Sequence, residues 1–378
     1  MCNKCYFMEN NMRVIVTGGG TGGHIYPALS IVDRIKTAIP DCEILYVGSE
    51  YGLEKKIVGE NNSIKYVSIN VRGFDRRNIF KFIFSFLLLF VSIIQSFFII
   101  KKFKPNLVIG TGGYVCGPVL FVASLLKIDT FIHEQNIVPG VTVKILSKFA
   151  TKVLVSFKET IEYFKNTNNI FYTGNPVRKE FFNVNRENSR KQYNIDSNEK
   201  VIITIGGSGG SEIFNKIAFD IIDYVKCNDN IVYYHITGRK YYDNFKSILD
   251  TMNVDGKIRI LDYCDDMPNL LATADLCISR AGAIALSEIS ALSIPSILIP
   301  SPYVAHNHQE KNANYFSKLG CCKILLEKDL NKDVLLKNID DILKNDKLRM
   351  HMKQNFSDLN KENALDVIIS MVYDYYIK

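Results

Sequence analysis

The feature that most constrains this chain is a pattern that occurs twice. The segments RVIVTGGGTGG (13–23) and KVIITIGGSGG (200–210) are each an apolar, β-branched run followed by a cluster of glycines and then by helix-length sequence. Strand, glycine turn and helix in this order open a Rossmann-type unit. A chain of 378 residues is also longer than one hydrophobic core usually supports. The repetition therefore predicts two Rossmann-like domains.

Apolar strand-length runs alternate with helix-length segments on both sides of a polar stretch that ends near residue 200. This alternation is typical of an α/β fold with parallel sheets and crossover helices. We expect an N-terminal domain over 12–175, a C-terminal domain over 176–360, and a final helix over 361–378 that packs back on the first domain. Because such sheets bind ligands at the carboxyl ends of their strands, two facing sheets would form a cleft lined by both glycine loops.

Composition excludes several classes of protein. Nine scattered cysteines, with no second C-x-x-C to complete a zinc site, favour a reduced, cytosolic compartment, and no apolar N-terminal run of signal-peptide length is present. No basic run is interleaved with stacking aromatic residues, so we expect no nucleic-acid partner. The chain also has no D-x-D motif, which argues against a metal-bridged diphosphate.

The positive charge is concentrated around the most apolar segment. Of a net charge of +7, the stretch 70–104 supplies +6, and it encloses 19 consecutive uncharged residues over 82–100. Aligned serines break the apolar surface, and the strand-like neighbours belong to one sheet, so we do not expect a membrane span. The alternatives are a fully buried crossover helix and one whose outer face enters a lipid surface, which we favour. The expected membrane patch comprises Arg76, Arg77, Lys81, Phe82, Phe86, Lys101 and Lys102.

Glycines after a strand let the backbone approach a phosphate, and the following helix presents free N–H groups to it. A third glycine loop, GTGGYVCGP (110–118), suggests more than one phosphate-bearing ligand. A nicotinamide cofactor is only a minor alternative, because Glu50 falls late for a ribose-binding acid. His24, at the mouth of the first loop, is a candidate general base.

Two further motifs carry polar groups at strand ends. HEQN (133–136) follows an apolar run and has the character of a substrate-positioning loop, although it could be a plain polar loop. In SRAGAIALSE (279–288), Glu288 is either an ordinary helix acid or an acceptor for a ribose diol. The histidines of HNHQEKN (306–312) are too few for a metal site.

In their order, GGTGGH, GTGGYVCGP, HEQN, GNPVR, GGSGG, SRAGA and HQEKNA resemble the MurG family of glycosyltransferases over most of the chain. The resemblance implies a GT-B fold in which the C-terminal half binds UDP-N-acetylglucosamine. It implies that the N-terminal half receives lipid I, a lipid-linked muramoyl-pentapeptide, at the cytoplasmic membrane face. It further implies a peripheral enzyme that transfers N-acetylglucosamine to the acceptor's C4 hydroxyl with inversion, without metal or cofactor. A cell-wall synthesis complex is the protein partner that the resemblance suggests.

The same resemblance implies roles for individual residues. His24 would be the base, and the acceptor would lie against Gly20, Gly113, Tyr114 and Glu134. The donor would contact Thr21, Gly22, Gly23, Asn136, Arg178, Ser208, Cys264, Ala283, Ile284, Ala285, Leu286, Ser287, Glu288 and Gln309, with Glu288 on the ribose and the backbone near Cys264 on the uracil. The chain departs from the family pattern at Gly209, Ala285 and Val143, where the family commonly has Gln, a hydroxyl residue and Asn.

Other functions remain open at this point. A different GT-B enzyme, such as a diacylglycerol glycosyltransferase or a UDP-N-acetylglucosamine 2-epimerase, would share the fold. A catalytically silent sugar-nucleotide-binding protein at the membrane is the alternative from another class.

Overall fold

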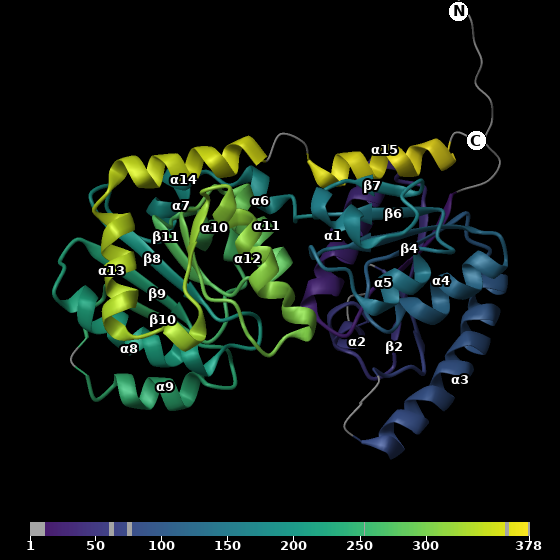
Figure 1. Cartoon of the computed structure of the whole chain (residues 1–378), viewed down its shortest axis with the longest axis horizontal. Helices are drawn as coiled ribbons and strands as arrows, with labels where there is room; N and C mark the ends of the chain where they lie inside the picture. Colours follow the sequence, from purple (N-terminus) through teal and green to yellow (C-terminus); the bar gives the residue numbers. More distant parts are fainter. Residues whose placement is uncertain (1–11, 60–63, 74–77, 253, 360–362, 377–378) are drawn as a thin grey trace, which may run out of the picture. The chain divides into compact units, whose positions relative to one another are not determined.

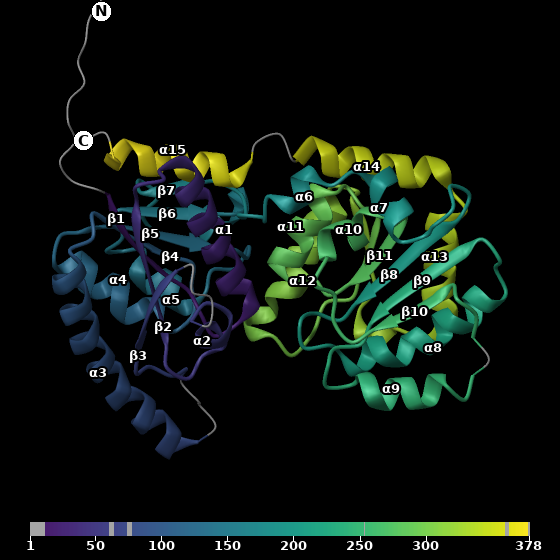
Figure 2. The same cartoon turned by 180° about the vertical axis from the view of Figure 1, so that it is seen from behind.

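The computed structural model describes residues 12–59, 64–73, 78–252, 254–359 and 363–376. The chain forms two compact units, one with the residues up to Pro176 and those from Glu362 onward, the other from Val177 to Lys361. The boundaries expected at 175/176 and 360/361 each lie one residue from these positions. Each unit is an α/β Rossmann-like domain with a parallel sheet, so the predicted fold class is confirmed (Figures 1 and 2).

The first unit contains a seven-stranded parallel sheet in the order β3-β2-β1-β4-β5-β6-β7. Its strands alternate between faces: Val14 and Val16 of β1 pack on one side and Ile15 on the other. Its elements are β1 (Arg13–Thr17), α1 (Gly22–Ala38), β2 (Glu43–Ser49), α2 (Leu53–Ile57), β3 (Lys65–Ile69), α3 (Ile79–Phe103), β4 (Leu107–Gly110), α4 (Cys116–Leu125), β5 (Asp129–Glu134), α5 (Val141–Leu146), β6 (Lys152–Val155), a 3-10 turn (Lys158–Tyr163), β7 (Ile170–Tyr172) and α15 (Ala364–Tyr376).

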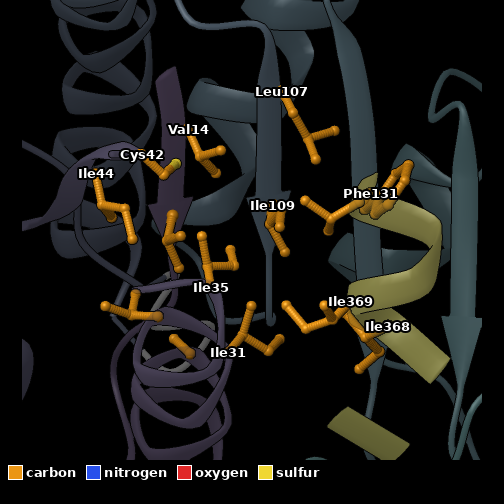
Figure 3. Packing of buried hydrophobic residues seen from close by; sticks show 14 of the residues in the cluster. Val14, Ile31, Ile35, Cys42, Ile44, Leu107, Ile109, Phe131, Ile368 and Ile369 are labelled. Atoms are coloured by element: carbon orange, nitrogen blue, oxygen red, sulfur yellow. The ribbon is translucent and has the colours of Figure 1, made fainter. Parts of the chain in front are cut away.

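Helices cover both faces of this sheet. Helix α1 buries residues at helical spacing, among them Ile31 and Ile35, and α15 adds Ile368 and Ile369 to the same core (Figure 3). The guanidinium of Arg34 donates to the carboxylate of Asp366 on α15 at 2.8 Å. Helices α3, α4 and α5 pack on the opposite face. The C-terminal helix therefore belongs to the first unit, although the chain enters it from the second.

The second unit contains a six-stranded parallel sheet in the order β10-β9-β8-β11-β12-β13. Helices α8 and α13 share one core with it, which includes Phe214, Ile221 and Leu335. Its elements are α6 (Glu180–Asn183), α7 (Arg186–Gln192), β8 (Lys200–Ile205), α8 (Glu212–Lys226), β9 (Ile231–Ile236), α9 (Tyr242–Leu249), β10 (Ile258–Leu261), α10 (Met267–Ala272), β11 (Leu276–Ser279), α11 (Ala283–Ala291), β12 (Ser296–Leu298), a 3-10 turn (Ala305–Asn307), α12 (His308–Lys318), β13 (Cys322–Ile324), a 3-10 turn (Glu327–Asp329), α13 (Lys332–Leu343) and α14 (Asp346–Leu359).

Candidate active site

Two glycine loops meet at the carboxyl edge of the first sheet. β1 and β4 are neighbours, with Thr17 paired to Gly110, so the loops that follow them leave the sheet side by side. Gly113 has φ +84°, and a Cβ there would lie 2.2 Å from the carbonyl oxygen of Gly19. Only glycine permits this approach. The close packing fixes the backbone of the first loop just before α1 begins.

His24 lies in the first turn of α1 and is half-buried. Its Nδ1 is 3.1 Å from the carbonyl oxygen of Gly19 and 3.3 Å from the hydroxyl oxygen of Thr21, the residue at the N-cap position of the helix. A carbonyl can only accept, so Nδ1 carries the proton in this contact and Nε2 is the acceptor nitrogen. The hydroxyl of Thr111 donates to the carbonyl oxygen of His24 at 2.7 Å. The contacts at Nδ1 thus orient the imidazole in the tautomer that a general base requires, and the Thr111 hydrogen bond holds the backbone of His24.

The buried carboxylate of Glu54 lies beneath the same loop. It accepts the backbone N–H of Gly20 and that of Ser49, each at 2.9 Å, and the residue has no exposed surface. Glu50, the acid that falls late for a nicotinamide ribose, lies elsewhere: its carboxylate is bound by Lys55 and Ser68. Nothing local distinguishes the two acids, because Glu54 reaches Gly20 only through the fold.

Tyr114 lies against the first glycine loop, in the region expected to face the acceptor. The residue is half-buried, and a Cβ on Gly20 would lie 2.9 Å from its ring. Burial and the negative charge of Glu54 raise the pKa of Tyr114, whereas a hydrogen bond with Ser49 and the charge of Arg72 oppose the shift. Tyr114 is therefore a neutral hydroxyl group at neutral pH.

The HEQN segment forms an internal network. Its first three residues are buried, and Glu134 accepts the backbone N–H of Asn136 at 2.9 Å and that of Gly140 at 2.8 Å. Burial raises the pKa of Glu134 and lowers that of His133 to about 4. The amide of Gln135 donates to the carbonyl oxygen of Thr111 at 2.8 Å. Instead of a plain polar loop, the structure has a frame that shapes the loops around His24 and leaves Asn136 half-exposed.

The second unit presents two helix N-termini at one edge of its sheet. β8 and β11 are neighbours, with Ile205 paired to Ser279, and each is followed by a glycine and a helix, α8 or α11. The backbone of Gly210 (φ +73°) packs directly on Gly238. Ser208 is exposed in the first of these loops, and Ala283 begins α11. Two adjacent helix N-termini suit an anion with two phosphates.

Glu288 and Arg178 form an ion pair, although 110 positions separate them in the sequence. The guanidinium Nη2 of Arg178 lies 3.2 Å from Oε1 of Glu288. Burial raises the pKa of Glu288, and the charge of Arg178 opposes the shift. Two residues predicted to bind the donor are thus brought together at the second turn of α11.

The remaining predicted donor residues lie around the same edge. Gln309, at the start of α12, accepts the backbone N–H of Ser301 at 2.9 Å. Cys264 follows β10, and burial together with the charge of Asp266 raises its pKa to about 11. Three positions depart from the family pattern. Gly209 is exposed, and a Cβ added there would meet no atom within 4 Å, while Ala285 is half-buried. Val143 lies in the core of the first unit. Val143 is therefore not placed to contact a ligand.

Helix α3 presents its large apolar side chains outward. The serine stripe (Ser85, Ser92 and Ser96) is buried against the unit, and the amide oxygen of Gln95 accepts the backbone N–H of Asn70 at 2.7 Å. Its exposed residues include Ile83, Phe84, Phe86, Leu87, Phe90, Val91, Ile94, Phe97 and Phe98. The fully buried alternative is therefore wrong.

Of the charged patch residues, Lys101 and Lys102 are exposed at the end of α3. Arg76 and Arg77 lie outside the described residues, and the side chains of Lys81 and Phe82 are also outside the description. By length and composition α3 could cross a membrane, and only 22% of its most apolar window is buried. Its two ends, however, join β3 and β4 of one parallel sheet, and its inner face packs on α4. A spanning orientation would break these contacts.

Metal ligands do not cluster in the described part of the chain: no three His, Cys, Asp or Glu side chains there are placed to hold an ion. The polar groups at both sheet edges are backbone amides, an imidazole, an arginine and carboxylates. Such a set suits anionic and hydroxylated ligands.

Comparison with known proteins gives consistent matches. The glycosyltransferase family 28 N-terminal domain matches residues 14–155, and the family 28 C-terminal domain matches residues 201–368. A UDP-N-acetylglucosamine–N-acetylmuramyl-(pentapeptide) pyrophosphoryl-undecaprenol N-acetylglucosamine transferase of Acetivibrio thermocellus is 44% identical, covering 96% of this chain and 98% of the relative. A protein of the same name from Clostridioides difficile is 41% identical over 97% of this chain and 89% of the relative.

Solved structures support the fold. The crystal structure of MurG from Acinetobacter baumannii matches with a TM-score of 0.75 at 24% identity, covering 96% of this chain and 99% of that one. A UDP-N-acetylglucosamine 2-epimerase from Listeria monocytogenes, described as putative, matches with a TM-score of 0.70 at 12% identity, over 97% of both chains. At these identities both likenesses concern the fold alone. The two family matches and the full-length relatives together show that the chain belongs to glycosyltransferase family 28.

Proposed function

We propose that this protein transfers N-acetylglucosamine from UDP-N-acetylglucosamine to the C4 hydroxyl of the muramoyl sugar of lipid I, giving lipid II for peptidoglycan synthesis. The observation that carries the proposal is the 44% identity, over nearly the whole of both chains, to the N-acetylglucosamine transferase of Acetivibrio thermocellus. The residues that the motifs single out occupy the strand ends where such substrates bind in α/β sheets.

The second unit binds the donor in this proposal. The N-termini of α8 and α11 hold the diphosphate through backbone N–H groups, and Ser208 adds a hydroxyl. Glu288 accepts hydrogen bonds from the ribose, and Arg178, which is its ion-pair partner in the structure, contacts the donor phosphates. Backbone amides take the place of a metal ion in stabilising the charge on departing UDP.

The first unit binds the acceptor. Its two packed glycine loops and the N-terminus of α1 face the lipid-linked diphosphate, with Tyr114 beside them. Nε2 of His24 accepts the proton of the C4 hydroxyl, because Nδ1 is held by the carbonyl of Gly19. Glu134 and its neighbours shape this site from within the unit and leave Asn136 to reach toward a ligand.

The reaction is a single in-line displacement. The acceptor's C4 oxygen forms a bond to C1 of the donor sugar as the bond from C1 to the UDP oxygen breaks. The electron pair leaves with UDP, the proton moves to His24, and the anomeric configuration inverts from α to β. Transfer requires that the sugar held by the second unit meet the hydroxyl held by the first.

The proposal includes peripheral attachment to an anionic membrane through α3. The outward aromatic and aliphatic side chains enter the interface while the serine stripe keeps the helix on its domain. Lys101 and Lys102 at the helix end contact anionic headgroups. A membrane-bound substrate such as lipid I would thereby reach the glycine loops without leaving the bilayer surface.

One assay separates this activity from its alternatives. Purified protein is supplied with UDP-N-acetylglucosamine in detergent and either lipid I, diacylglycerol or no acceptor, and UDP release and sugar products are measured. We expect UDP release only in the arm that contains lipid I. Release with diacylglycerol, release without an acceptor together with N-acetylmannosamine, or no release in any arm would each refute the proposal.

A further inference from the structure

One peptide group connects Glu54 to His24. The N–H of Gly20 donates to Oε2 of Glu54 at 2.9 Å, and the carbonyl oxygen of Gly19 accepts from Nδ1 of His24 at 3.1 Å. These two atoms belong to the same peptide bond, between Gly19 and Gly20. The planar group therefore holds the carboxylate on one side and the imidazole on the other.

The fold provides a close-fitting site for this carboxylate. A Cβ added at Gly19 or Gly52 would lie within 2.4 Å of a Glu54 carboxyl atom, and one added at Gly48 would lie 2.8 Å from Cγ of the same side chain, so glycines line the site of Glu54. The backbone N–H of Ser49 donates to its other oxygen at 2.9 Å. The charge is paired by backbone dipoles, since no cation among the described residues forms an ion pair with Glu54. Its negative charge is consequently exerted on the groups around it.

Hydrogen bonds in a chain polarise one another. A carboxylate that accepts the N–H of a peptide group increases the electron density on the carbonyl oxygen of that group. This oxygen is the acceptor for Nδ1–H of His24. A stronger acceptor at Nδ1 fixes the tautomer and stabilises the imidazolium, which makes Nε2 more basic.

We propose that Glu54 is a positioning residue that acts on His24 through the Gly19–Gly20 peptide group, in the way that a carboxylate hydrogen-bonded directly to histidine acts in other enzymes. Its consequence for turnover rests on the proposed role of His24 as the base. The effect on the imidazole itself does not depend on that role.

Other ionisable groups face the same loop. The hydroxyl of Tyr46 donates to the carbonyl oxygen of Gly18 at 2.6 Å, and Tyr114 lies against Gly20. Both are neutral at neutral pH, because burial raises their pKa values. The positive charge of Arg72 lowers the pKa of Tyr114, and the guanidinium carbon of Arg72 lies 3.9 Å from the centroid of the Tyr51 ring. Among the described groups that face the loop, Glu54 is thus the one that carries a negative charge.

The test is a histidine NMR titration of the full protein without substrate. The chain has six histidines, and a His24→Gln spectrum assigns the resonances of His24. We expect Glu54→Gln to lower the pKa of His24 by roughly half a unit to one unit, since one nearby negative charge is lost. Glu50→Gln is the matched control, because it removes a carboxylate from the same strand end that does not contact the loop.

Kinetics provide a second readout. In Glu54→Gln the acid limb of the kcat profile should move to lower pH by the same amount, with KM for UDP-N-acetylglucosamine unchanged. Should this variant not fold, the wild-type protein is titrated instead, and the Gly20 amide resonance should shift with the midpoint of the His24 ring. The proposal is overturned if the pKa of His24 is unchanged in folded Glu54→Gln. It is also overturned if the chemical shift of the Gly20 amide stays constant while the His24 ring titrates. If Glu54→Gln shifts the pKa of His24 but the wild-type protein has no transferase activity, the coupling between Glu54 and His24 stands and the proposed function is refuted.

Discussion

Replacing Leu87, Ile94 and Phe98 by serine should release the protein from lipid vesicles. These residues repeat the spacing of the serine stripe two positions further along α3, which places them about 200° around the helix on its outer side. They are 58%, 58% and 65% exposed. The substitution therefore removes apolar surface that contributes little to the core of the unit.

The magnitude follows from the area these side chains expose. Complete burial of a large aliphatic or aromatic side chain is worth about 1.5–3 kcal/mol, so an exposed fraction near three-fifths corresponds to about 1–2 kcal/mol each. The three together contribute about 3–5 kcal/mol to partitioning if the outer face enters the lipid. At 1.4 kcal/mol per tenfold, we expect partitioning to fall by about a hundredfold to a few thousandfold.

Co-sedimentation with phosphatidylglycerol-containing vesicles measures the partition coefficient. The matched control replaces Ile248, Leu319 and Met350, which are 45%, 39% and 70% exposed on the second unit, by serine. Both triple variants should keep the thermal midpoint of the wild type within a few degrees. Equal sedimentation of the α3 variant and the wild type would refute the assignment of this face to the membrane.

Four further predictions concern the two units. His24→Ala should lower turnover about a hundredfold or more, with UDP affinity unchanged by calorimetry; normal turnover would exclude His24 as the base. Gly209→Gln restores the family's side chain in open space, and we expect KM for the donor to fall about threefold to tenfold, as for one added hydrogen bond; an unchanged or higher KM would contradict this. Because the pKa of Glu288 is raised, UDP affinity should fall on acidification at a higher pH than an ordinary glutamate predicts, and Glu288→Gln should abolish that dependence. Burial lowers the pKa of His133 to about 4, so the unfolded chain takes up the proton first as the pH falls. The free energy of unfolding should therefore drop between pH 6.5 and 4, by about 2 kcal/mol at pH 5 in urea unfolding; a pH-independent unfolding free energy would refute this.

The fold was predictable because its signals are local. Each apolar run becomes a strand since β-branched residues on both faces suit a parallel sheet covered by helices, as in β1 and β8. The glycine turns mark where each strand ends, and the neighbouring strands then bring the loops together. Glu288 and Arg178, which motifs pick out independently, are brought into contact because α6 packs against α11.

The parts that the sequence did not reveal depend on three-dimensional neighbours. The HEQN side chains have the composition of an exposed loop, but β6 and the segment near Gly174 cover them, and His133 bonds the carbonyl oxygen of Gly174 at 2.9 Å. Glu54 lies 34 residues from the peptide group that it holds, so spacing alone does not distinguish it from Glu50. For α3, the helical spacing of the sequence shows a serine stripe, but it does not show which side of the helix faces the sheet.

The activity proposed for this protein is inverting transfer to a defined hydroxyl of a lipid-linked acceptor. The most direct measurement is NMR of the disaccharide released from the product formed with lipid I and UDP-N-acetylglucosamine. We expect N-acetylglucosamine in a β linkage to C4 of the muramoyl sugar. An α linkage, attachment at another oxygen, or recovery of unmodified lipid I would contradict it.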